Sequence, residues 1–221
     1  FRAFANGMDG VFIGGCILNE CNYITHGNYQ ALNMVLLCKK IMEHIGLNPD
    51  RLRIELMSSG EGTVYVDVAN DFVRQVRELG PIGKAEGLSE DELASKLAEV
   101  RKLIPYIKIV KRDKLEARLE SKEEYAGYYT SGEIDQMFSE VVSYYIDPEK
   151  CKACMICLRK CPVEAIEGGK GLIHVIDQDK CIKCNTCFEV CPEKFSAVTK
   201  IVSAPVPPPV PEEARMIVRE K

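Results

Sequence analysis

The stretches DPEKCKACMICLRKCP (residues 147–162) and DQDKCIKCNTCFEVCP (residues 177–192) are two copies of one motif. Each residue of the second copy follows its match in the first by 30 positions, as Cys181 follows Cys151. Both copies have the spacing C-x2-C-x2-C-x3-C, with a proline directly after the last cysteine. The cysteines are Cys151, Cys154, Cys157 and Cys161 in the first copy, and Cys181, Cys184, Cys187 and Cys191 in the second.

This spacing is typical of bacterial proteins that hold two [4Fe–4S] clusters. Three closely spaced thiolates reach three iron corners of one cubane, while the fourth cysteine ligates the other cluster. The motif therefore predicts two crossed ligand sets. The sets are Cys151, Cys154, Cys157 and Cys191 for the first cluster, and Cys181, Cys184, Cys187 and Cys161 for the second.

Zinc and disulfides are the alternatives to iron–sulfur clusters. A structural zinc site needs four ligands, usually two pairs separated by a finger-length spacer, and two unbroken quartets fit that pattern poorly. Disulfide frameworks belong mainly to short secreted chains, whereas this chain has 221 residues and an odd number of cysteines, 11. We therefore favour iron–sulfur clusters.

Residues 147–202 resemble a dicluster ferredoxin domain of the bacterial type. The resemblance implies a pseudo-twofold α+β unit with a short helix after each cysteine quartet. One departure is visible, because VEAI follows Pro162 whereas EKFSAV follows Pro192. The second half is thus two residues longer before its apolar pair.

The overall composition is that of a globular protein, with 46% hydrophobic and 28% charged residues. A net charge of −4 leaves no basic footprint for nucleic acid. The sequence has no apolar run of the roughly 20 residues that a membrane span needs, and no secretory leader opens it. We expect a cytoplasmic protein.

The region before residue 82 alternates predicted strands and helices. Residues 10–15 (GVFIGG) predict a buried strand, residues 28–45 have helical apolar spacing, and residues 52–56 alternate as a second strand would. This order predicts an α/β domain with part of a parallel sheet.

A further helix is predicted after the second strand. Ser58 and Glu61 fit the S-x-x-E capping box, and Gly80-Pro81 would end the helix. Residues 63–68 (TVYVDV) would also pass as a strand.

Cys16 and Cys21 lie in GGCILNEC (residues 14–21), directly after the first predicted strand. Open α/β sheets place their ligands at the carboxyl ends of strands, so the pair could supply half of a metal site. The plainer interpretation is two structural cysteines. Cys38 falls on the inner face of the predicted helix and is interpreted as a core residue.

Residues 9–29 (DGVFIGGCILNECNYITHGNY) and 51–62 (RLRIELMSSGEG) are similar to the delta subunit of methyl-viologen-reducing hydrogenase. This resemblance covers about residues 1–80. It implies a [2Fe–2S] cluster held by four cysteines, of which Cys16 and Cys21 match the last two. The family often has histidine where this chain has Ile17 and Asn22.

The chain opens on Phe1, in a stretch that resembles the end of a helix closed by Gly7. We therefore expect a fragment of a longer polypeptide, with the two remaining [2Fe–2S] ligands before residue 1 and Cys38 as a reserve ligand.

The rest of the chain carries no predicted catalytic residue. Ser89 and Glu92 predict a capped helix that ends at Pro105, and residues 131–145 predict another helix. The proline-rich tail should be extended and lie on a partner. The glycines near residue 14 lack the G-x-G-x-x-G order of nucleotide-binding loops. The three histidines, interpreted as isolated surface or loop residues, are His26, His44 and His174.

The predicted fold is an α/β domain with a partial parallel sheet, then a helical connector, then an α+β dicluster ferredoxin-like domain. The predicted segments are 1–81 for the delta-subunit-like domain, 82–146 for the connector, 147–202 for the ferredoxin domain and 203–221 for the tail.

The resemblances imply an electron-transfer subunit of an anaerobic oxidoreductase complex. It would relay electrons between a hydrogenase, formate dehydrogenase or NADH dehydrogenase module and a heterodisulfide-reductase-A-like flavoprotein. One alternative is the C-terminal region of a larger flavoenzyme of that type. Another is a structural assembly subunit whose clusters lie off the electron path.

Overall fold

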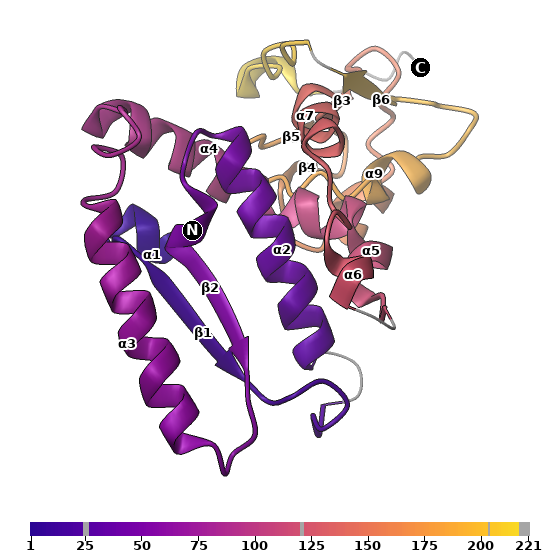
Figure 1. Ribbon diagram of the computed structural model, residues 1–221. Coiled ribbons are helices and arrows are strands. Elements are labelled where there is room, and N and C mark those ends of the chain that lie inside the picture. The colour runs from indigo at the N-terminus through magenta and orange to yellow at the C-terminus, as the bar shows by residue number, and fades with distance from the viewer. Residues whose placement is uncertain (24–26, 120–121, 203, 217–221) are drawn as a thin grey trace, which may run out of the picture. The chain divides into compact units, whose positions relative to one another are not determined.

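The computed structural model describes the chain except for residues 24–26, 120–121, 203 and 217–221 (Figure 1). The interpretation of His26 thus falls outside the described residues. The chain divides into two compact units, Phe1–Gln136 and Met137–Lys221. Across the described residues, no helix is both long and apolar enough to cross a bilayer.

Two short strands and the helices around them open the first unit. These elements are α1 (Arg2–Ala5), β1 (Val11–Gly15), α2 (Asn28–His44), the 3-10 turn η1 (Pro49–Arg51), β2 (Leu52–Leu56) and α3 (Gly62–Leu79). β1 and β2 pair in parallel, from Val11 opposite Leu52 to Gly15 opposite Leu56, which confirms both predicted strands. The predicted burial of the first strand is wrong, because the residues of β1 are half-buried or exposed. Figure 1 shows the strand pair running between α2 and α3.

The core of this unit lies mainly along α2. Apolar side chains at helical spacing turn away from solvent, as the sequence predicts. The phenyl ring of Phe72 on α3 covers β1, with its centroid 5.7 Å from that of Phe12. The buried apolar residues include Val35, Leu37, Ile41, Met42, Ile45, Leu47, Leu52 and Phe72.

The predicted start of α3 is wrong. The helix begins at Gly62, and Ser58 makes only half of the capping box, because its backbone N–H donates to Glu61 Oε2 at 2.7 Å. Two glycines in SSGEG make early helical turns costly, so a turn precedes the helix. Residues 63–68 are helical rather than extended, and Val64 is 41% exposed there.

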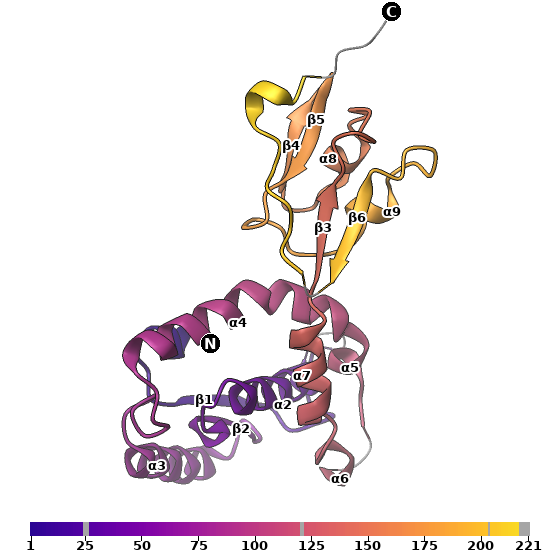
Figure 2. The same ribbon diagram turned by 90° about the horizontal axis from the view of Figure 1, so that it is seen from above.

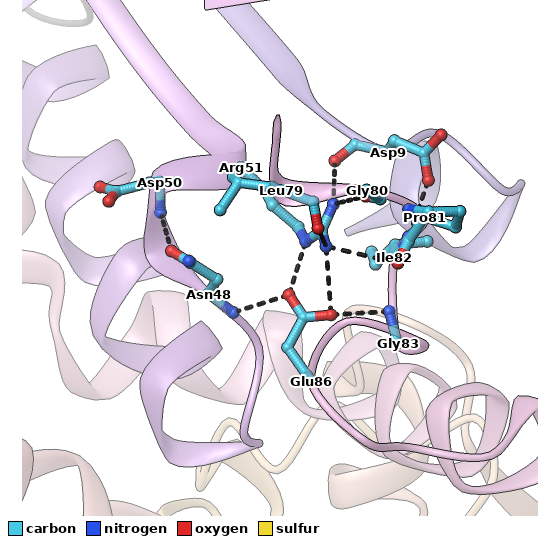
Figure 3. Close-up of polar contacts among 10 residues, drawn as sticks. All are labelled: Asp9, Asn48, Asp50, Arg51, Leu79, Gly80, Pro81, Ile82, Gly83 and Glu86. Atoms are coloured by element: carbon cyan, nitrogen blue, oxygen red, sulfur yellow. Dashed lines mark hydrogen bonds and ion pairs between the residues drawn. The ribbon is translucent and has the colours of Figure 1, made fainter. Parts of the chain in front are cut away.

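A buried ion pair ties the ends of these elements together (Figure 3). Arg51, whose side chain is 0% exposed, donates from Nε to Glu86 Oε1 at 2.6 Å. Its other nitrogens donate to main-chain carbonyls, at 3.0 Å to Asp9 and 2.8 Å to Gly80. Glu86 in turn accepts from the backbone N–H of Gly83 at 2.9 Å. The pair therefore joins the entries to both strands with the exit from α3.

The segment after α3 is helical, as predicted. It contains α4 (Glu90–Val110), α5 (Arg112–Glu116), α6 (Lys122–Tyr125) and α7 (Ser131–Ser139). The capping box of Ser89 and Glu92 is confirmed. Pro105 does not end α4, although a proline inside a helix costs about 3 kcal/mol. The next turn buries Tyr106 and Ile107, which offsets this cost.

The second unit contains antiparallel strand pairs with short helices beside them, visible in Figure 2. β3 (Val142–Ile146) pairs with β6 (Val198–Val202), and β4 (Ile166–Gly169) pairs with β5 (Leu172–Ile176). The helices are α8 (Ile156–Lys160) and α9 (Thr186–Glu189).

Two predictions for this unit are wrong. The helix predicted over 131–145 ends at Ser139, and VSYYI at 142–146 forms β3, as its β-branched and aromatic residues favour. The short helices span the third cysteine of each copy rather than following the quartet.

The proline-rich tail lies against its own unit, and its predicted contact with a partner stays a prediction. The backbone N–H of Ile173 on β5 donates to the carbonyl of Arg215 at 2.7 Å. The guanidinium of Arg215 contacts Glu167 on β4 at 3.2 Å. Leu172 forms an isolated antiparallel bridge with Met216. The tail adds main-chain hydrogen bonds to β5, which the sequence pattern did not reveal.

Candidate metal centres

A pocket in the second unit gathers the cysteines of the predicted second set. The fourth cysteine of the first copy, Cys161, lines this pocket together with Cys181, Cys184 and Cys187. The rest of the lining is almost entirely apolar. It consists of Pro162, Val163, Ala165, Ile166, Ile176, Ile182 and Thr186. The fold therefore brings residue 161 to the second triplet, as crossed ligation requires.

The thiols of the predicted first set also lie near one another. Burial and the neighbouring charges of Cys151, Cys154 and Cys191 raise the pKa of Cys157 to about 11. Burial and the charges of nearby cysteines raise the pKa of Cys187 to about 12, and Cys157 is one of those neighbours. The two sets are thus adjacent, and Cys157 and Cys187 share one buried core.

The backbone around each triplet is left-handed at matched positions. Ala153 (φ +50°) and Met155 (φ +66°) in the first copy correspond to Lys183 (φ +57°) and Asn185 (φ +69°) in the second. A positive φ is uncommon for residues other than glycine, and such residues cluster at functional sites. Each chain segment therefore curls around its own cysteines in the same way.

Main-chain N–H groups point at the sulfur atoms. Lys183 N lies 3.4 Å from Cys181 Sγ, and Ala165 N lies 3.3 Å from Cys161 Sγ. Hydrogen bonds of this kind stabilise cluster-bound thiolates and set their potential. Four thiols around an apolar pocket, with N–H donors aimed at sulfur, fit a [4Fe–4S] cluster.

A single metal ion would need a different arrangement. Within the part of the chain that the structure describes, no three His, Cys, Asp or Glu side chains converge as the ligands of one ion would. A cubane instead takes thiolates spaced around its corners, which is how the four cysteines line the pocket.

Cys16 and Cys21 lie together between β1 and α2, close enough that each thiol shifts the pKa of the other. The backbone N–H groups of Tyr23 and Asn28 donate to the sulfur of Cys21 and lower its pKa. The neighbouring thiol of Cys21 raises the pKa of Cys16. Cys21 is therefore the more readily ionised thiol of the pair.

Asn28 holds this loop in place, a role that sequence reasoning missed. Its side-chain amide, largely buried, donates to the carbonyls of Cys16 at 2.9 Å and Ile17 at 2.6 Å. Gly27 is needed for a different reason, because an added Cβ there would lie 2.7 Å from Cys21 Sγ. The signal in the sequence was a Gly-Asn pair at the start of the helix that follows two cysteines.

We expect Cys21 to react severalfold faster than Cys16 with iodoacetamide at neutral pH in the cluster-free chain, because the thiolate is the nucleophile. Gly27→Ala should displace the Cys21 sulfur from its N–H donors and slow its alkylation. Peptide mass spectrometry measures both rates in one sample, with Cys16 as the internal reference. Equal alkylation rates of Cys16 and Cys21 in the chain without substitutions would contradict the conclusion that Cys21 is the more readily ionised thiol.

Cys38 lies apart from this pair. It is only half-buried, and burial raises its pKa to about 11. A helix rises about 1.5 Å per residue, so Cys38 lies roughly 15 Å along α2 from Asn28. The idea of Cys38 as a reserve ligand is therefore wrong.

His174 is buried, which corrects its interpretation as a surface or loop residue. It lies on β5 with 1% of its surface exposed, and its Nδ1 is 3.4 Å from Cys157 Sγ. Burial lowers the pKa of His174. His44 is a partly exposed residue, as predicted, with Nδ1 2.6 Å from Asp135 Oδ1.

Comparison with known proteins identifies the same two regions. Residues 1–80 match the family described as methyl-viologen-reducing hydrogenase, delta subunit. Residues 142–195 match the 4Fe-4S dicluster domain family. Residues 176–220 match the 4Fe-4S single cluster domain of Ferredoxin I. The second match begins at β3, so it includes the strand that the sequence prediction placed in a helix.

Curated relatives share parts of this chain. The A-type subunit of ferredoxin:CoB-CoM heterodisulfide reductase from Methanosarcina mazei is 40% identical over 101 residues, which are 46% of this chain and 12% of that protein. The D-type iron-sulfur subunit of F420-non-reducing hydrogenase from Archaeoglobus profundus is 42% identical over 80 residues, which are 36% of this chain and 58% of that protein. The matched segment thus spans a minor part of the first relative and just over half of the second.

Proposed function

We propose that this chain, which joins a hydrogenase delta-subunit domain to a 4Fe-4S dicluster ferredoxin domain, is an electron-transfer subunit of an oxidoreductase complex. The observation that carries the proposal is the pocket that unites Cys161 with the second cysteine triplet. Two adjacent clusters with crossed ligands form a path for single electrons.

In this proposal each cluster takes three ligands from one copy of the motif and one from the other. The first cluster is held by Cys151, Cys154, Cys157 and Cys191, and the second by Cys181, Cys184, Cys187 and Cys161. The clusters supply one-electron redox chemistry. The chain's own residues hold them, exclude water with the apolar pocket lining, and donate N–H hydrogen bonds to sulfur.

The first cluster is the one that we propose exchanges electrons with a partner. Its ligand Cys154 is exposed, whereas Cys181, Cys184 and Cys187 are half-buried or buried. Ile156, two residues after Cys154, is also exposed and offers apolar surface for a docked protein.

We further propose half of a [2Fe–2S] site at Cys16 and Cys21. Three observations support a ligand role for this loop. The two thiols lie together, the pKa of Cys21 is lowered, and the side chain of Asn28 holds the loop by hydrogen bonds. The two remaining ligands would come from polypeptide outside these 221 residues, because the described position of Cys38 is too far along α2.

The partners are proposed from the names of the relatives. The donor would be a hydrogenase module, with formate and NADH dehydrogenase modules as alternatives, and the acceptor a heterodisulfide-reductase-A-like flavoprotein. We place the complex in the cytoplasm, where thiols stay reduced.

A second candidate is that these residues are the C-terminal electron-transfer region of a larger heterodisulfide-reductase-A-like flavoenzyme. The relative from Methanosarcina mazei favours it, because the match of 101 residues extends beyond the delta-subunit region. Purification under native conditions distinguishes the two, since a flavin would copurify on the same polypeptide.

Anaerobic reconstitution followed by iron and sulfide analysis tests the proposal. Two cubanes give about eight irons per chain, and a completed [2Fe–2S] site adds two. Rapid-freeze electron paramagnetic resonance (EPR) of the intact complex should show cluster reduction within one turnover. Clusters that are present but reduce more slowly than turnover would instead favour a structural assembly role.

A further inference from the structure

His174 is the one imidazole among the described residues that lies against a predicted cluster ligand. Its Nδ1 is 3.4 Å from Sγ of Cys157, and both side chains are buried. The distance is that of an N–H···S hydrogen bond. The contact joins β5, the strand directly before the second copy of the motif, to α8 in the first copy.

The ring is held in one position by the backbone of β4. Gly168 has a φ of +147°, and a Cβ added there would lie 2.2 Å from Cδ2 of His174. No side chain larger than hydrogen fits between the strand and the ring. The glycine therefore lets the imidazole lie close against the β4 backbone, with Nδ1 within reach of the sulfur.

The chemistry of the sulfur decides which nitrogen carries the proton. A cluster-bound thiolate offers lone pairs and no hydrogen, so the facing nitrogen must be the donor. Nε2 has no hydrogen-bond partner among the described residues, so no acceptor there competes for the proton. The neutral ring is thus protonated at Nδ1.

We propose that Nδ1–H of His174 donates a hydrogen bond to Sγ of Cys157 and thereby raises the reduction potential of the first cluster. This inference rests on the cluster assignment in the proposed function. One added electron makes the cluster sulfurs more negative, so a donated hydrogen bond stabilises the reduced state more than the oxidised state. The electron enters without any proton leaving the imidazole.

The two copies of the repeat carry different side chains at the position of His174. The offset of 30 residues between the copies matches His174 on β5 with Tyr144 on β3. Tyr144 is also buried, but it carries a phenol in place of the imidazole. His174 therefore adds an imidazole donor to the first cluster alone, and Tyr144 offers a matched control position.

The test uses the full chain carrying Cys161→Ala and Cys187→Ala, which removes two proposed ligands of the second cluster and leaves the first. Against this background, His174→Leu should lower the equilibrium constant for reduction of the first cluster about tenfold. For one electron, this equals a fall of about 59 mV in the reduction potential. His174→Gln keeps an N–H donor and should recover part of the loss. Tyr144→Phe should leave this potential unchanged. EPR-monitored redox titration measures all four.

A spectroscopic experiment covers the case in which His174→Leu fails to hold a cluster. Protein labelled with 15N-histidine should show a hyperfine coupling between the reduced first cluster and one imidazole nitrogen, without any substitution. The inference would be overturned if this coupling were absent. It would also be overturned if the first cluster had the same reduction potential with and without His174→Leu in the Cys161→Ala/Cys187→Ala chain, both proteins holding a complete first cluster. Failure of the unsubstituted chain to bind about eight irons would overturn the proposed function instead.

Discussion

The double substitution Cys161→Ala/Cys187→Ala is expected to halve the iron content, from about eight to about four irons per chain. The two residues belong to different copies of the motif, yet both line the same pocket. Under the proposed crossed ligation, removing both takes two ligands from the second cluster and none from the first. Iron and sulfide analysis after anaerobic reconstitution gives the result directly.

A matched double substitution separates crossed from local ligation. Cys161→Ala/Cys157→Ala removes two cysteines of one copy, and under crossed ligation it damages both clusters. Iron should then fall well below about four per chain. If the fourth cysteine instead served its own copy, the outcomes of the two double substitutions would be exchanged.

Glu86→Gln is expected to lower the free energy of unfolding of the first unit by about 3–5 kcal/mol, because it leaves a buried guanidinium without its counter-charge. Arg51 is fully buried and Glu86 is 9% exposed. Hydrogen exchange of the amides in β1 and β2 measures the free energy of unfolding of the first unit separately from that of the second. Asp71→Asn, which weakens exposed pairs with Arg53 and Arg74, is the control and should cost less than about 1 kcal/mol.

The same pair predicts a dependence on pH. Burial opposes ionisation of Glu86, but hydrogen bonds from Arg51 and from the backbone N–H of Asn48 outweigh it and hold its pKa below the ordinary 4.5. The stabilisation is therefore present above pH 4.5 and is lost as the pH falls through the lower pKa of the folded state. The difference between the parent and Glu86→Gln should shrink in acid. A difference that stays constant on acidification would contradict the ion-pair explanation.

Local spacing was enough to predict much of the chemistry. A cubane needs several thiolates from a few adjacent turns of chain, so the positions of Cys151, Cys154 and Cys157 indicate the cofactor without knowledge of the fold. Short-range periodicity likewise predicted β1, α2 and β2, because each buries one face against its neighbours. The two-residue extension after Pro192 also has a structural counterpart. The positive-φ residues Glu164 and Ser196 lie three and five positions after their fourth cysteines.

Long-range pairing decided what local patterns could not. Residues 142–146 form a strand because β6, far along the chain, supplies their hydrogen-bond partners. Pro105 stays inside a helix because tertiary burial of the next turn offsets its cost.

The sequence by itself predicted the type of cluster and the spacing of its candidate cysteine ligands, since those depend on residues a few positions apart. Only the tertiary structure decided what surrounds the sulfurs. The helix N-terminus near Cys21 and the imidazole against Cys157 both come from other elements. A hydrogen bond to sulfur requires a donor in contact with the sulfur atom, and only the packing of distant segments brings these donors there.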